Sequence, residues 1–109
     1  MKGTFHAVTL NVRKLDSSTG SVLRRHMSAA WEGGARVVAL DLSELIYIDS
    51  LGISALVSEQ RKRPEHGKIV LCSLTDYVRD VLEVTQLVRV FDVYATVDAA
   101  RAAFDEGAG

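Results

Sequence analysis

Short apolar runs alternate with amphipathic segments along the chain, and this alternation constrains the fold more than any other feature. Residues 37–42 and 69–72 are nearly continuous apolar runs, which is typical of strands buried on both faces of a sheet. Residues 4–12 predict an N-terminal strand and residues 90–94 a final one. Residues 46–48 are expected to extend the second strand after a kink.

Helical spacing of apolar residues follows each predicted strand. Residues that commonly cap helices precede these segments, and Gly33 and Pro64 are expected to end the first and second helices. The expected caps are Asp16 to Thr19, Asp49 with Ser50, Thr75 with Asp76, and Thr96. The residues expected to face the core are Leu23, Met27, Ala30, Trp31, Ile53, Leu56, Val57, Val78, Val81, Leu82, Thr85, Val97, Ala100, Ala103 and Phe104.

The predicted order of elements is therefore β-α-β-α-β-α-β-α. This order indicates an α/β fold with a four-stranded, mostly parallel or mixed sheet and helices packed against it. A chain of 109 residues suffices for one domain, which we expect to span residues 1–109 with a frayed tail at residues 106–109.

Composition narrows the classes of function. The formal net charge is −1, and acidic and basic residues are mixed, without the basic stripe of a nucleic-acid binder. The N-terminal residues lack the apolar core of a secretion signal, and no segment approaches the ~20 apolar residues that span a bilayer. A single cysteine, Cys72, excludes an internal disulfide framework. We therefore expect a cytoplasmic protein without membrane insertion.

Candidate catalytic and metal-binding residues are scattered. His6, His26 and His66 lie far apart, with no cysteine or carboxylate at the spacing of a metal site. Cys72 lies within a predicted buried strand, where a thiol is a poor nucleophile. No glycine-rich phosphate loop follows the first strand. We therefore expect neither an enzyme nor a bound metal or cofactor.

The junction between the second strand and the second helix, at Asp49 and Ser50, is the strongest candidate site. The carboxyl ends of parallel strands open onto a crevice where ligands and partners bind. One explanation is structural, since Asp and Ser are common helix caps. The other is that Ser50 is phosphorylated. A phosphate of about −1.5 to −2 charges would lie at the positive end of the helix dipole, which the fold tolerates and a docked partner does not.

Two segments around this junction resemble the central motif of the STAS domain family, the anti-sigma factor antagonists. Residues 38–43 read Val-Ala-Leu-Asp-Leu-Ser, and residues 48–53 read Ile-Asp-Ser-Leu-Gly-Ile. Leu15 with Asp16 is similar to the step that precedes the family's first helix, and residues 87–94 are similar to its late region. The resemblance covers nearly the whole chain.

The resemblance implies a phosphorylation switch. In this family, the serine after the motif's aspartate is phosphorylated by a kinase that is also an anti-sigma factor, and the unphosphorylated form binds that kinase and frees the sigma factor. Ser50 would then be the phosphoacceptor of a bacterial regulator of transcription. The implied partners are this kinase and a phosphatase, with self-association as a further expectation. The implied partner-binding residues are Asp16, Asp49, Ser50, Leu51, Gly52 and Ser54.

Three departures from the family pattern keep other functions open. Leu51 replaces a small or hydroxyl residue, Arg13 replaces a glycine, and no strand is evident before residues 4–12, which would expose a sheet edge. The first alternative is a scaffold subunit of the stressosome or transporter-associated type, in which Ser50 is only a cap. The second is a module that binds a nucleotide or lipid, although no glycine-rich loop or basic pocket residue lies near the junction.

Overall fold

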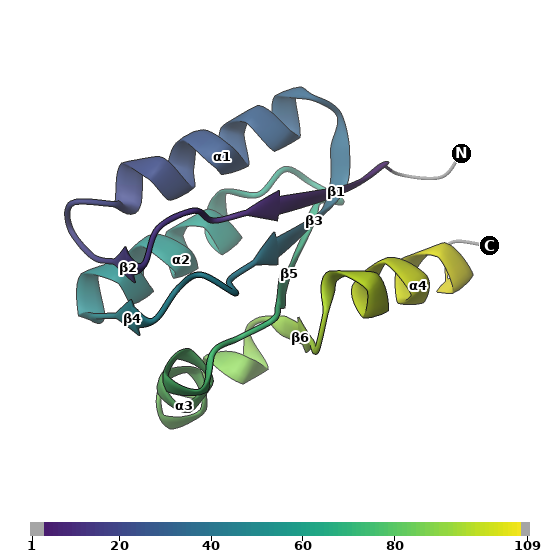
Figure 1. Ribbon diagram of the computed structural model, residues 1–109. Coiled ribbons are helices and arrows are strands. Elements are labelled where there is room, and N and C mark those ends of the chain that lie inside the picture. The colour runs from purple at the N-terminus through teal and green to yellow at the C-terminus, as the bar shows by residue number, and fades with distance from the viewer. Residues whose placement is uncertain (1–3, 108–109) are drawn as a thin grey trace.

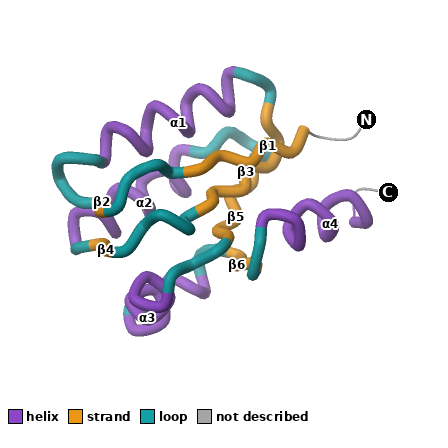
Figure 2. Tube along the Cα trace, in the orientation of Figure 1, coloured by secondary structure: helices purple, strands orange, loops and turns teal. Residues whose placement is uncertain are grey.

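Four parallel strands form the central sheet of the computed structural model, which describes residues 4–107. Their order across the sheet is β1-β3-β5-β6 (Figure 1). Two shorter strands, β2 and β4, pair in parallel as a separate two-stranded sheet (Figure 2). The expected α/β fold with a parallel sheet is confirmed. The strands are β1 (Thr4–Thr9), β2 (Lys14–Leu15), β3 (Ala35–Asp41), β4 (Tyr47–Ile48), β5 (Lys68–Cys72) and β6 (Asp92–Tyr94).

Helices cover both faces of this sheet. Figure 1 shows α1 and α2 together on one side of the sheet and α4 on the other, with α3 below β4. The helices are α1 (Gly20–Glu32), α2 (Ser50–Lys62), α3 (Asp76–Val84) and α4 (Val97–Gly107), with a short 3-10 helix, η1 (Leu87–Arg89), before β6. No helix within the described residues is long and apolar enough to span a bilayer.

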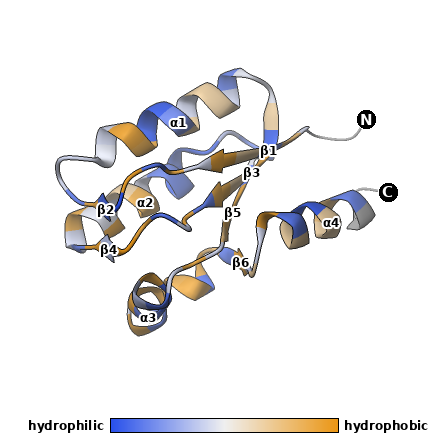
Figure 3. Ribbon diagram, viewed as in Figure 1, coloured by the Kyte–Doolittle hydropathy of each residue, from blue (hydrophilic) through white to orange (hydrophobic). Residues whose placement is uncertain are grey.

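Alternating residues of the central strands divide the core into two parts. Val38, Leu40 and Leu71 belong to the larger cluster with α1, α2 and α3, whereas Val70 and Cys72 pack with α4. Figure 3 shows hydrophobic colour along these central strands. The prediction that these strands are buried on both faces is therefore confirmed. Burial, with a smaller effect of Asp41, raises the pKa of the Cys72 thiol to about 11, so a thiol is the form present at neutral pH.

The sequence suggested that residues 46–48 extend the second strand, and this prediction was wrong. The Asp41 carboxylate accepts a hydrogen bond from the Ser43 backbone N–H (2.9 Å), and the Leu45 N–H donates to the Leu42 carbonyl (3.1 Å). These turns lead the chain out of the main sheet. Tyr47 and Ile48 therefore pair with β2 instead.

Two other element boundaries differ from the prediction. The first strand ends at Thr9 rather than at residue 12. The final strand begins at Asp92 rather than at residue 90, because the Val90 and Phe91 N–H groups donate to the Leu87 carbonyl in η1. The start of α1 agrees with the prediction, because Thr19, the last of the expected caps, is its N-cap.

Two expected core residues are exposed. Thr85 is the C-cap of α3, and Ala103 lies on the exposed side of α4. The end of α2 agrees with the prediction, because Arg63 before Pro64 is extended (φ −58°, ψ 146°). Helix α4 continues through Gly107, into the segment expected to fray, and residues 108–109 lie outside the described residues.

Candidate functional site

The small β2–β4 sheet brings two distant segments of the predicted site together. Lys14 pairs with Tyr47 and Leu15 with Ile48 in a parallel ladder. Asp16 and Asp49 therefore follow neighbouring strand ends and lie at the same edge. The Leu15 carbonyl also accepts a hydrogen bond from the Asp49 N–H (3.3 Å).

Asp49 is the residue that caps α2. Its backbone is extended (φ −108°, ψ −174°), and its carboxylate accepts a hydrogen bond from the Gly52 N–H at 2.9 Å. The side chain thereby satisfies one of the backbone donors that a helix leaves free in its first turn. Ser50 is the first residue of the helix proper. The capping role that the sequence shared between Asp49 and Ser50 thus belongs to Asp49.

Gly52 lets α2 lie directly against β2. A methyl group added at Gly52 would overlap the Leu15 carbonyl oxygen, and it would lie 2.7 Å from the Leu15 carbonyl carbon and 2.9 Å from Ile48 Cγ1. Gly52 is buried. Close packing therefore requires a glycine at this position, and a contact of Gly52 with a partner stays a prediction.

Asp16 organises the turn before α1. Its carboxylate accepts hydrogen bonds from the Ser18 backbone N–H (2.9 Å), from the Ser18 hydroxyl (2.7 Å) and from the Thr19 hydroxyl (3.3 Å). The hydrogen bond from the Ser18 side chain is the main cause that lowers the pKa of Asp16, followed by the one from the Ser18 backbone. The half-buried Asp16 side chain is thus kept ionised beside the start of α2.

Ser50, Leu51 and Ser54 are exposed on the first turns of α2. Among the described residues, no hydrogen bond involves the Ser50 side chain. Ser54 lies one helical turn after Ser50 and so on the same side of the helix. The leucine is 57% exposed, which places an apolar side chain next to a free hydroxyl.

Exposed aromatic residues that the sequence pattern did not indicate also lie at this end of the molecule. Tyr47 of β4 stacks on Tyr77 of α3, with ring centroids 5.8 Å apart and planes 11° from parallel. The signal in the sequence was a tyrosine on the polar side of α3, between Asp76 and Arg79.

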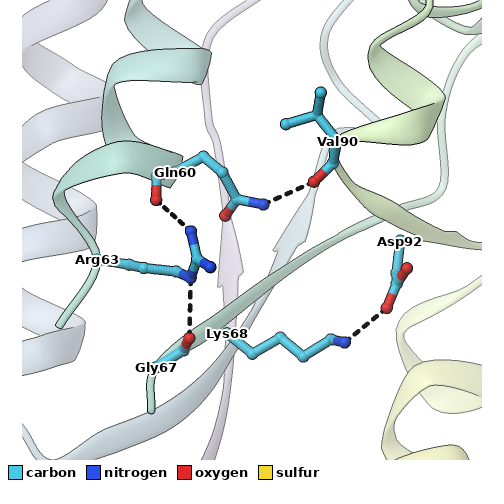
Figure 4. Close-up of polar contacts among 6 residues, drawn as sticks. All are labelled: Gln60, Arg63, Gly67, Lys68, Val90 and Asp92. Atoms are coloured by element: carbon cyan, nitrogen blue, oxygen red, sulfur yellow. Dashed lines mark hydrogen bonds and ion pairs between the residues drawn. The ribbon is translucent and has the colours of Figure 1, made fainter. Parts of the chain in front are cut away.

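A cleft of about 620 Å³ lies at the opposite end of the sheet, where α2 ends and β5 and β6 begin. Figure 4 shows its polar contacts: Gln60 donates to the Val90 carbonyl (2.7 Å), Arg63 to the Gly67 carbonyl (3.0 Å), and Lys68 pairs with Asp92 (2.7 Å). These contacts join neighbouring elements of the fold. The cleft is remote from Ser50.

The described residues contain no group of three or more His, Cys, Asp or Glu side chains that could hold a metal ion. His26 instead contacts the Asn11 side chain (3.2 Å), and His66 contacts the neighbouring Glu65 (3.3 Å).

The division of roles between Asp49 and Ser50 gives a first prediction. Asp49→Ala is expected to lower the free energy of unfolding by about 1 kcal/mol, because the Gly52 N–H loses its acceptor. Ser50→Ala is the matched control and should change it by less than about 0.5 kcal/mol. Urea unfolding followed by circular dichroism measures both. Equal losses in the two variants would show that Ser50 shares the capping role.

Comparison with known proteins identifies the family. A family model described as the STAS domain matches residues 7–100 of the chain. The chain is also similar to BtrV of Bordetella bronchiseptica, which is named as a candidate anti-sigma factor antagonist. The two are 35% identical over 91 residues, which cover 83% of this chain and 78% of BtrV.

Solved structures share the fold. A candidate anti-sigma factor antagonist from Thermotoga maritima superposes with a TM-score of 0.76 at 24% identity, over 91% of this chain and 87% of that one. A sulfate transporter family protein from Wolinella succinogenes superposes with a TM-score of 0.79 at 17% identity, over 93% of this chain and 84% of that one. The phosphorylated form of SpoIIAA from Bacillus superposes with a TM-score of 0.61 at 18% identity, over 89% of this chain and 88% of that one. At these identities the structures establish the fold alone.

Proposed function

The chain belongs to the STAS domain family, and from this premise we propose that it is an anti-sigma factor antagonist whose binding to an anti-sigma factor is controlled by phosphorylation of Ser50. The anti-sigma factor would itself be the serine kinase. The observation that carries the proposal is the exposed Ser50 hydroxyl, free of hydrogen bonds in the described structure, at the first position of α2.

The local geometry suits a phosphoacceptor. Asp49 rather than Ser50 caps the helix, so modification of the serine leaves the cap in place. The backbone N–H groups of the first turn and the positive end of the helix dipole then favour the added negative charge. In the transfer step the Ser50 oxygen attacks the γ-phosphorus of ATP, a base of the kinase accepts the hydroxyl proton, the bond from the γ-phosphorus to the bridging oxygen breaks, and ADP leaves. The chain itself supplies no catalytic group in this step.

The same phosphate would oppose a docked partner. Ser50 is followed by the exposed Leu51 and preceded by Asp49. A protein that covers this surface would have to remove water from a phosphate dianion beside an apolar side chain. The Asp49 carboxylate next to the phosphate would add a second negative charge at the same place. Phosphorylation therefore changes the partner affinity without rearranging the fold.

The relatives support the antagonist over the alternatives. BtrV, which matches most of this chain, is named as a candidate antagonist. The transporter family protein shares only the fold at 17% identity, so its likeness does not by itself favour a transporter-associated role.

The proposal is tested by phosphorylation in vitro. The purified chain is incubated with ATP and with each anti-sigma factor kinase encoded by its source organism, and the modified residue is mapped by mass spectrometry. We expect one phosphate on Ser50, its loss in Ser50→Ala, and its retention in the matched variant Ser54→Ala. Phosphate on Ser54 alone would refute the assignment of the acceptor. Absence of both phosphorylation and binding would refute the switch and favour the scaffold function.

A further inference from the structure

Large exposed hydrophobic side chains concentrate beside Ser50. Of the seven such residues in the described structure, four belong to β4, the segment just before it, and the starts of α2 and α3. We call these four residues, Ile46, Tyr47, Leu51 and Tyr77, the aromatic strip. Two of them, Tyr47 and Tyr77, stack on each other. Clustered exposed apolar side chains mark interaction sites in soluble proteins, whereas single exposed residues are ordinary.

The strip crosses three elements that are held in place. Figure 1 shows β4 between the first turn of α2 and α3. The Thr75 hydroxyl, at the N-cap of α3, donates to the Leu45 carbonyl at 2.7 Å. The stacked rings of Tyr47 and Tyr77 remain 40% and 46% exposed. Because the rings support each other, little side-chain entropy remains to be lost on binding.

The charges along the strip are unequally distributed. At the α3 end, Asp76 directly precedes Tyr77, and Glu44 lies two residues before Ile46. Both carboxylates belong to exposed residues. At the β2 end, the exposed Lys14 pairs with Tyr47. A cation from another protein would therefore meet carboxylates and an aromatic face at the α3 end, where cation–π and ionic attraction act together.

We propose that the anti-sigma factor docks along the aromatic strip, with an apolar segment over Leu51 and Tyr47 and a lysine or arginine against Tyr77 and Asp76. This inference rests on the proposed function and adds the chemistry of the partner surface. In this arrangement the contacts at the α3 end supply most of the affinity for the partner. Phosphorylation of Ser50 at the other end, where the contact is apolar, controls whether the partner binds.

Binding of purified anti-sigma factors by isothermal titration calorimetry tests the proposal. Tyr77→Ala is expected to weaken binding by about 10- to 100-fold, as for an aromatic residue central to an interface. Tyr77→Phe, which keeps the ring, should retain most of the affinity. Val84→Ala is the matched control, because Val84 lies on the same helix and is 83% exposed outside the strip.

The charge at the α3 end is tested separately. Asp76→Asn is expected to weaken binding by up to about 5-fold, and the loss should shrink at high salt. Asp98→Asn is its control, because Asp98 occupies the first turn of α4 as Asp76 does in α3. The two variants lose the same helix-dipole interaction, so only a direct contact distinguishes them.

The outcomes separate this inference from the proposed function. If the wild-type chain binds, Ser50→Asp weakens binding, and Tyr77→Ala and Asp76→Asn bind like their controls, the aromatic strip is refuted while the switch stands. If the wild-type chain binds no anti-sigma factor of its source organism, both proposals are refuted. Selective loss in Tyr77→Ala and Asp76→Asn, with controls unchanged and all variants folded, supports the strip.

Discussion

Gly52→Ala is expected to lower the free energy of unfolding by about 3 kcal/mol, the range of a core position that receives an extra methyl group. The added Cβ would overlap the Leu15 carbonyl oxygen and crowd Ile48 Cγ1 at 2.9 Å. A backbone carbonyl cannot rotate away as a side chain can. Either β2 or the first turn of α2 must therefore shift, and urea unfolding measures the cost.

Gly20→Ala is the control for this variant. Gly20 is the first residue of α1, and its added Cβ would make an ordinary contact of 3.6 Å with Ala55 Cβ. Since alanine favours helices over glycine, Gly20→Ala should leave stability unchanged or raise it by up to about 1 kcal/mol. If both variants unfold at the same urea concentration, the contact between α2 and β2 is not rigid.

Displacement of β2 would reach the candidate site. Asp16 follows directly after Leu15, whose carbonyl accepts from the Asp49 N–H and faces Gly52. A shift that relieves the overlap at Gly52 therefore moves Asp16 away from Asp49. The folded fraction of Gly52→Ala is thus expected to bind an anti-sigma factor more weakly than the wild-type chain.

The main sheet was predictable because its signals are local. The strands β3 and β5 are apolar on both faces, which a run of five or six residues reveals by itself. The end of α2 was likewise predictable, since the effect of Pro64 on Arg63 is steric and confined to neighbours.

The β2–β4 pairing was not predictable from local pattern. Each strand has only two residues, too few to show a period, and Leu15 meets Ile48 across 33 positions of the chain. Without this pairing the sequence could place Asp16 near Asp49 only through a family resemblance. The sequence likewise could not show which atoms require a glycine at position 52, because the Leu15 carbonyl that faces Gly52 comes from this distant segment.

The Tyr47–Tyr77 stack was missed for a related reason. A tyrosine among Asp76, Arg79 and Asp80 on α3 looks like part of a solvated helix face. Its stacking partner, Tyr47, is 30 residues away in the chain, in a segment that the sequence assigned to the second strand of the main sheet. Packing between elements, rather than helical period, decides which exposed side chains form one surface.

Phosphorylation of Ser50 is expected to weaken binding of the anti-sigma factor by at least about 100-fold, because a like charge or an unpaired desolvated charge in an interface costs several kcal/mol. Ser50→Asp, with one negative charge and less bulk, should weaken it by about 10-fold, and Ser50→Ala should bind like the wild-type chain. Ser28→Asp adds the same charge at an exposed position of α1 and is the control.

Each of these forms should unfold within about 0.5 kcal/mol of the wild-type chain, since a helix N-terminus tolerates an anion. Calorimetric titration gives the affinities and urea unfolding the stabilities. Equal affinities for the phosphorylated and unphosphorylated chains would mean that the partner does not cover Ser50. A loss of stability as large as the loss of affinity would mean that the phosphate acts by unfolding α2, rather than by excluding a partner from a domain that keeps its fold.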